Sequence, residues 1–307
     1  MRSSRLAAVA FVALLPACKS AKGVEVDAAL LVPKDASLVI GFDVKALRDS
    51  KLGGPIAESM ATDPENKARL DGFAACNVNT DDFRGLIAGS LTSETSMIVL
   101  ESPGLGDEDV VRCVEKEIGK SMGQDSGLLL FETKGDVRTI PQEGGGQLII
   151  LNKNAVVLAD APWDIEVLAA IESADKRNTG TPMATLLESA TKDSDVFVAA
   201  TIGAMERTEM GELPGSASLE TVLVKVGLTD GVKLDAKFDF GADADAEEFR
   251  GTAPVLVSAA KSGLAGTGMP EDLFDNLVFA GEGKQVTATW SVAADVVPKL
   301  VAAAAGS

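Results

Sequence analysis

The sequence predicts an α+β protein with two similar lobes, each a mainly antiparallel sheet with helices packed on one face. Three observations lead to this prediction. About 290 residues follow an apolar N-terminal leader, and one hydrophobic core seldom extends over so long a chain. Short segments of alternating apolar and polar residues are interleaved with helical patterns. The order β-α-β-β-α-β-β-α fits both halves as a weak internal repeat, although two unrelated lobes would also share so common an order.

The first lobe is expected over residues 32–174, and it opens with a strand at 37–44 whose apolar side chains alternate. A helix is predicted from Pro64 to Cys76, with Asp63 as its N-cap. Further strands are expected near residues 84–90, 95–101, 128–133, 137–140, 147–151 and 155–159, with helices at 107–118 and 163–173.

Residues 175–182 are the expected join, and the second lobe covers residues 183–307. Its clearest element is a hairpin of strands 222–228 and 232–238, which meet at Asp230-Gly231, a pair that favours a tight primed turn. Charged residues occupy the other face of the return strand, so this sheet should be hydrated on one side. The remaining elements are a strand at 195–201, a helix at 243–262, a hairpin of 277–280 with 285–292, and a C-terminal helix.

Residues 1–17 have the pattern of a signal peptide, because two arginines precede an apolar run too short to span a bilayer. The run ends in Leu15-Pro16-Ala17-Cys18, which resembles the lipobox of bacterial lipoproteins, with Pro16 replacing the usual small residue. The resemblance implies that Cys18 is acylated and that residues 18–31 form a lipidated N-terminus and spacer. Alternatively, an ordinary signal peptidase releases a soluble protein and Cys18 is incidental.

The sequence around the cleavage point also indicates a location. Lys19, rather than aspartate, follows the cysteine and resembles the signal that sends lipoproteins to an outer membrane, facing the periplasm or the cell surface. The opening of the body, Val32-Pro33-Lys34-Asp35-Ala36 and then Ile40-Gly41-Phe42-Asp43, resembles that of lipoproteins from myxobacteria and relatives. This resemblance implies a location and a fold, and it supplies no catalytic or binding residue.

The formal net charge of −18 makes nucleic acid an unexpected partner, because nucleic acids bind basic surfaces. The same charge repels anionic lipid head groups, so the body is expected to stand away from the bilayer. The thirteen residues from Lys19 to Leu31 reach at most about 45 Å when extended, which permits such a separation. The expected partners are therefore the membrane, through the lipid anchor, and an unidentified envelope protein or ligand.

The chain contains no histidine, which removes the commonest proton shuttle and transition-metal ligand. Cys76 and Cys113 are too few thiols for structural zinc, and neither a metal site nor a cofactor is predicted. In an exported protein these two cysteines are a candidate disulfide. The alternative is a pair of buried free thiols, because Cys113 shares an apolar helical face with Val110 and Val114.

These exclusions favour a lipid-anchored, non-enzymatic envelope protein that binds or scaffolds another component. A carboxylate-based hydrolase is one alternative, since 46 acidic residues make close acid pairs inevitable. A soluble periplasmic ligand-binding protein is the other, and it requires an unmodified Cys18. For an exposed ring at a binding surface, Trp163 near a helix start is a better candidate than Trp290, which alternates with apolar residues.

Overall fold

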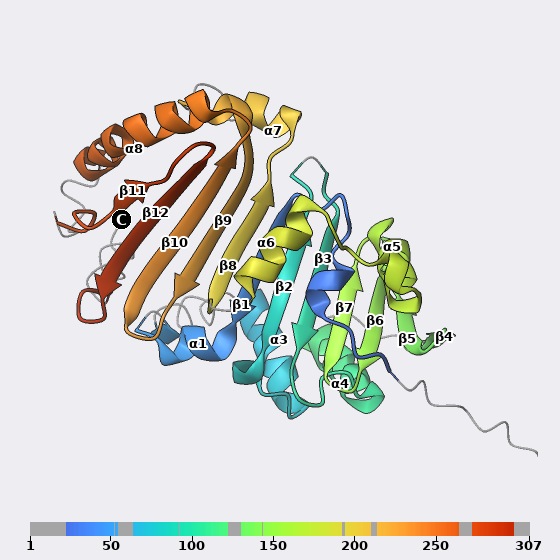
Figure 1. Cartoon of the computed structure of the whole chain (residues 1–307). Helices are drawn as coiled ribbons and strands as arrows, with labels where there is room; N and C mark the ends of the chain where they lie inside the picture. The colour runs from blue at the N-terminus through green and yellow to red at the C-terminus, as the bar shows by residue number, and fades with distance from the viewer. Residues whose placement is uncertain are drawn as a thin grey trace, which may run out of the picture.

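A computed structural model describes residues 23–51, 53–54, 64–91, 93–121, 130–142, 144–191, 194–209, 214–263 and 272–297. The expected signal peptide, the acylation site Cys18, the N-cap Asp63 and the body of the expected C-terminal helix lie outside these residues. Within them the chain is an α+β protein built on one large antiparallel sheet (Figure 1). The predicted fold class is therefore confirmed at this level.

The described strands are β1 (Leu38–Asp43), β2 (Arg84–Gly89), β3 (Ser96–Glu101), β4 (Glu132–Lys134), β5 (Val137–Pro141), β6 (Gln147–Asn152), β7 (Ala155–Ala159), β8 (Val196–Thr201), β9 (Leu219–Gly227), β10 (Gly231–Phe240), β11 (Val278–Ala280) and β12 (Gln285–Ala293). The α-helices are α1 (Val44–Asp49), α3 (Pro64–Ala75), α4 (Glu108–Ser121), α5 (Trp163–Glu172), α6 (Pro182–Ala190), α7 (Ala204–Glu209) and α8 (Asp243–Gly263). Short 3-10 turns are η1 (Ala28–Leu31), η2 (Thr80–Asp82), η3 (Ala174–Lys176) and η4 (Ser216–Ser218).

The described strands form one sheet of twelve in the order β11-β12-β10-β9-β8-β1-β2-β3-β7-β6-β5-β4. The sequence halves meet where β1 pairs antiparallel with β8, with Val39 opposite Ala199. This differs from the expectation of a separate sheet in each half. Alternating apolar residues identify a strand and its buried face, but they do not determine which other strand pairs with its edge.

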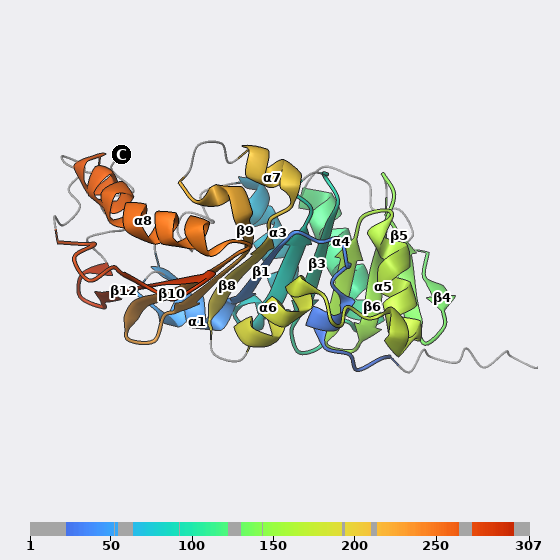
Figure 2. The same ribbon diagram turned by 45° about the horizontal axis from the view of Figure 1, so that its top comes forward.

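Helices cover both faces of the sheet, rather than one (Figures 1 and 2). On one side, called the α4 face, α3 and α4 pack over the first half of the chain and α8 over the second. On the other side, called the α6 face, η1 and α5 pack over strands of the first half, while α6 packs beside η1 over β8 and β9 of the second half. The helices therefore form two layers, one on each face of the sheet.

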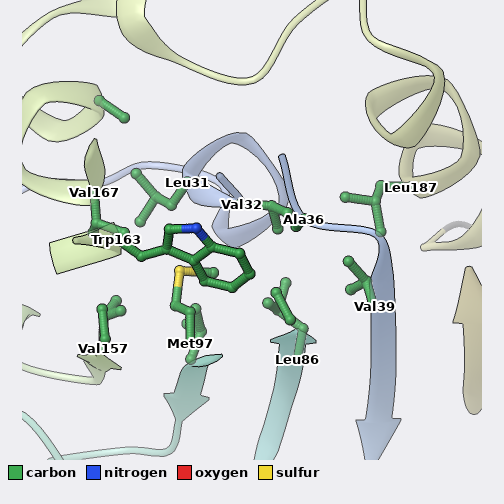
Figure 3. Close-up of a cluster of buried hydrophobic side chains, with 14 of the residues drawn as sticks. Leu31, Val32, Ala36, Val39, Leu86, Met97, Val157, Trp163, Val167 and Leu187 are labelled. Atoms are coloured by element: carbon green, nitrogen blue, oxygen red, sulfur yellow. The ribbon is translucent and has the colours of Figure 1, made fainter. Parts of the chain in front are cut away.

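The largest hydrophobic core lies on the α6 face, under η1, α5 and α6. Trp163 is its largest side chain and is 1% exposed. Its ring lies between Leu31 and Val32 on one side and Met97 and Val157 on the other (Figure 3). The expectation that this ring is the better candidate for exposure is therefore wrong, because the N-terminal segment covers it.

The segment from Gly23 to Leu31 belongs to the folded body. The backbone amide of Val24 donates a hydrogen bond to the carbonyl oxygen of Leu151 at 2.6 Å. Asn178 donates from its backbone amide to the carbonyl of Leu30 at 2.9 Å, and Leu31 is 1% exposed. These residues were expected to be part of an extended spacer, and instead they pack against the core.

The second half of the sheet has a polar surface on its α6 face. Lys233 pairs with Asp235 at 3.1 Å and Lys237 with Asp239 at 3.2 Å along β10. Asp239 also accepts a hydrogen bond from Gln285 on β12 at 3.0 Å. This agrees with the expected hydration of one side of the β9–β10 hairpin.

In the described part of the chain, no helix is long and apolar enough to cross a membrane.

Candidate functional site

A cavity of about 530 Å³ lies on the α6 face where four central strands end or begin. Strands β1 and β3 end there, and β2 and β8 begin there, so antiparallel pairing brings their terminal residues to one edge. The start of η1 and the residues after α6 form its remaining walls. The lining residues are Asp27, Ala28, Ala29, Phe42, Asp43, Arg84, Gly85, Leu86, Val99, Glu101, Thr191, Ser194, Asp195 and Phe197.

The floor of this cavity, called the central pocket, is apolar. Leu86, Val99 and Phe197 are buried there. The Phe197 ring lies against Gly41, and a Cβ atom at that position would be 2.0 Å from the ring. Glycine at position 41 therefore leaves room for the aromatic ring that forms part of the floor.

The rim of the central pocket carries one arginine between two acids on neighbouring strands. Arg84 faces Asp43 on β1 and Glu101 on β3 in the strand register. Its Nε donates to Asp43 Oδ2 at 2.8 Å, while Asp43 Oδ1 accepts the backbone amide of Ala46 at 3.0 Å and caps α1. The side chain of Arg84 is 70% exposed, so a ligand that enters the pocket can reach its guanidinium group.

The Glu101 carboxyl on the rim of the pocket has a raised pKa. Partial burial of its carboxyl raises its pKa, Asp27 and Glu25 raise it further, and Arg84 opposes this effect. In the described part of the chain, the Glu101 carboxyl has no hydrogen-bond partner. A nearby positive group would relieve the repulsion between Glu101 and Asp27, because it would stabilise the charged form of both.

The other polar groups of the rim also hold the local structure in place. Asp27 Oδ1 accepts the backbone amide of Ala29 at 2.9 Å and caps η1, and Asp195 Oδ2 accepts that of Leu228 at 2.7 Å. The hydroxyls of Thr191 and Ser194 donate to carbonyl oxygens of α6. Each of these oxygens retains lone pairs that a donor on a ligand can use.

The arrangement is therefore an open, acid-rich pocket with an apolar floor. Among the lining residues that the structure describes, four carboxylates and one guanidinium surround it, so this part of the rim is net negative. Such a site suits a small molecule that carries an ammonium or guanidinium group and an apolar portion. Among the described residues, no group of three or more Asp, Glu, Cys or His side chains is placed to hold a metal ion.

Comparison with known proteins identifies the fold and leaves the ligand open. No protein-family model and no curated protein matches the chain. The chain shares its fold with TP0453. Its crystal form I is 11% identical with a TM-score of 0.52, over 91% of this chain and 98% of TP0453. Crystal form IV is 12% identical with a TM-score of 0.48, over 90% and 97%.

The cysteines predicted from the sequence lie apart from the central pocket. Cys76, which follows α3, and Cys113 on α4 are joined by a disulfide, with an S–S distance of 2.06 Å and a Cα–Cα distance of 5.7 Å. Both belong to the core on the α4 face, whereas the pocket lies on the α6 face. The bond therefore fastens two helices together and contributes no group to the pocket.

Sequence reasoning did not predict any residue of the central pocket. Its rim combines residues from η1, β1, β2, β3 and β8, which come together only through the strand register. One signal was available: Asp43 and Asp195 each stand at one end of an alternating apolar strand. That signal places acids at strand ends, and it does not reveal that those ends meet.

Proposed function

We propose that this chain is a lipid-anchored protein of the cell envelope that binds a small organic cation in the central pocket, without catalysing a reaction. The observation that carries the proposed binding is Glu101, whose pKa is raised beside Asp27 at the mouth of a cavity with an apolar floor. An ammonium or guanidinium group between these two carboxylates would replace like-charge repulsion with attraction.

Isothermal titration of the purified protein with spermidine and with agmatine tests the binding. We expect saturable binding that weakens with salt and falls about tenfold or more in Glu101→Gln, since one charge-assisted contact contributes about 1.5–3 kcal/mol. Glu282→Gln, which removes an acid from the distant β11–β12 turn, is the matched control and should leave affinity unchanged. Equal affinities of wild type and Glu101→Gln would refute the site.

The anchor rests on the sequence Leu15-Pro16-Ala17-Cys18. Mass measurement of the mature N-terminus, together with membrane fractionation of wild type and Cys18→Ala, tests it. Wild type should carry acyl mass and sediment with membranes, whereas the variant should be released. Soluble wild-type protein cut at another bond would favour the soluble periplasmic ligand-binding alternative.

A carboxylate-based hydrolase is the second candidate, and it is favoured by the raised pKa of Glu101, since a general acid needs its proton near neutral pH. The exposure of Glu101 and Asp27 favours binding instead, because an acid for glycoside cleavage is usually enclosed. Hydrolysis of a chromogenic glycoside that is lost in Glu101→Gln would establish the enzyme.

The two-lobe arrangement is also part of this proposal. Outward from the β1–β8 pair, the first half runs β1-β2-β3-β7-β6-β5-β4 and the second half runs β8-β9-β10-β12-β11, so the halves correspond over their first five strands and β5 and β4 extend the first half. Over these five strands both halves have the same connectivity, in which a meander of three strands is followed by a hairpin whose later strand pairs with the meander. This supports two related lobes that share one sheet, with the central pocket at their junction.

A further inference from the structure

We propose that the end of the body formed by the β6–β7 turn, the β4–β5 turn and the start of α4 faces the bilayer at close range. The inference rests on the proposed acylation of Cys18. It adds an orientation to that proposal, because the structure fixes where the chain that follows Cys18 enters the folded body.

The entry point is fixed by contacts of the first described residues. Gly23 donates its backbone amide to the carbonyl of Asp136 at 3.3 Å, and Val24 donates to Leu151 at 2.6 Å. Asn152 Nδ2 donates back to the carbonyl of Val24 at 3.2 Å. The side chains of Val24 and Val26 pack against the core on the α6 face. The N–H and the C=O group of Val24 are thus both hydrogen-bonded, and they hold the chain beside the end of β6.

The docked segment shortens the tether. Gly23 is five positions after Cys18, and an extended chain covers at most about 18 Å over that length. The thirteen-residue spacer considered from the sequence would reach about 45 Å. An acyl chain on Cys18 therefore holds Gly23, the entry point, within about 18 Å of the membrane interface. The surface around Gly23 is then the surface of the body nearest the bilayer.

That surface is a set of turns locked to one another. The loop before α4 packs on the β6–β7 turn, where Gly106 donates to the carbonyl of Lys153 at 3.0 Å and Ser102 to that of Asn154 at 2.9 Å. A Cβ atom on Gly106 would be 1.9 Å from the carbonyl oxygen of Asn152. Because this contact is so close, the loop before α4 is held against the β6–β7 turn, and Val24 is hydrogen-bonded to the same end of β6.

The charge of this end disfavours attraction to the membrane, so in this proposal the tether alone holds it there. Asp107, Asp109 and Asp136 are exposed there, with Lys153 as their exposed basic neighbour. Arg138 forms an ion pair with Glu108, with 3.3 Å between Nη1 and Oε1. Anionic head groups repel such a surface, so the protein should not adsorb to vesicles without its acyl chains.

The orientation also brings the central pocket to the membrane-proximal end. Strands β1 and β6 are four positions apart in an antiparallel sheet, so they run in the same direction and end at the same edge. The β11–β12 turn lies at the opposite edge, because β12 also runs in that direction and begins after the turn. Eight inter-strand spacings, about 38 Å, separate that turn from the β6–β7 turn across the sheet. Because the two turns lie at opposite edges, the length of one strand also separates them.

Fluorescence quenching on vesicles tests the orientation. Full-length acylated protein carrying Lys153→Cys or Glu282→Cys is labelled with bimane and reconstituted into vesicles of neutral phospholipid with a quencher attached to the head group. Lys153 and Glu282 are exposed turn residues at the near and far ends. We expect several-fold stronger quenching of the label at position 153 than at position 282. Equal quenching at both positions in protein with confirmed acyl mass would overturn the orientation and leave the anchor intact.

A variant pair tests whether the docked segment sets the distance. Val24→Pro removes the amide that bonds to Leu151, so the tether should lengthen and quenching at position 153 should fall toward that at 282. Val24→Ala keeps the amide and serves as the control. Unchanged quenching in Val24→Pro would contradict the mechanism. Absence of acyl mass on Cys18 would instead refute the proposed anchor, and the orientation with it.

Discussion

At the scale of single residues, Glu101 links the chemistry of the central pocket to stability. Its pKa is raised in the folded protein, first by partial burial and then by Asp27. The folded state therefore binds more protons than the unfolded chain between the ordinary glutamate pKa of about 4.3 and the raised value. Stability must fall as pH rises through this window, and the loss persists above it.

Substitution of Glu101 should remove this loss. Glu101→Gln is expected to raise the free energy of unfolding at pH 7 by less than about 1 kcal/mol, because the rim is open to solvent. At pH 4 the change should be near zero, since the wild-type carboxyl is then largely protonated in both states. Urea unfolding at the two pH values measures the difference, with Glu282→Gln as the control. A loss of stability at pH 7 would contradict the argument.

The contact between Gly41 and Phe197 makes the pocket floor sensitive to a single methyl group. Gly41→Ala places a carbon 2.0 Å from the aromatic ring, which must then move. We expect a destabilisation of about 1–3 kcal/mol, as for other overpacked cores. The double variant Gly41→Ala/Phe197→Leu should recover part of this loss, and a double-mutant cycle by chemical denaturation measures the coupling. Strict additivity would show that the ring is not the obstacle.

At the scale of elements, the disulfide joins α3 to α4 on the face away from the pocket. It closes a loop with a sequence separation of 37, so it restricts the unfolded chain. The double variant Cys76→Ser/Cys113→Ser should lose about 4 kcal/mol of unfolding free energy. Denaturation of wild type with and without reductant provides the comparison. Ligand affinity under native conditions should stay unchanged, and a lost affinity would indicate coupling between the two faces.

Elements with strong local signals were predictable from sequence. The β9–β10 hairpin forms around Gly231, whose φ of 125° suits glycine, and it pairs Leu234 with Val226 as alternation implies. Helix α6 was missed within the expected join and the residues after it. Its signal was Thr181 before Pro182: the Thr181 hydroxyl accepts the Ala184 amide at 3.1 Å and caps the helix.

The tryptophans show where local patterns stop being informative. Trp163 begins a helix among polar neighbours, yet it is 1% exposed because the N-terminal segment packs over it. Trp290 alternates with apolar residues on β12, yet it is only partly buried, and its indole donates to the carbonyl of Leu273 at 2.7 Å. Burial here depends on segments distant in sequence, and so does the central pocket.

At the scale of the whole molecule, the β1–β8 pair determines how the halves relate. Each half was predicted as a separate sheet, since no local signal reports which edges meet. Five residue pairs join β1 to β8, from Leu38 opposite Ala200 to Phe42 opposite Val196. The core on the α6 face then continues across the junction, because it includes Phe197, Ala199 and Leu223 from the second half.

This continuity predicts that the halves unfold together. In Trp290→Phe, the remaining Trp163 reports on the first half by fluorescence, while far-UV circular dichroism reports on the whole chain. Both signals should share one urea midpoint, because loss of the β1–β8 pair exposes the core of both halves. Ala199→Asp buries a charge at the junction, where Ala199 is 0% exposed, so it should cost several kcal/mol of unfolding free energy and lower both midpoints equally. Separate midpoints would mean that the halves are independent lobes despite their shared sheet.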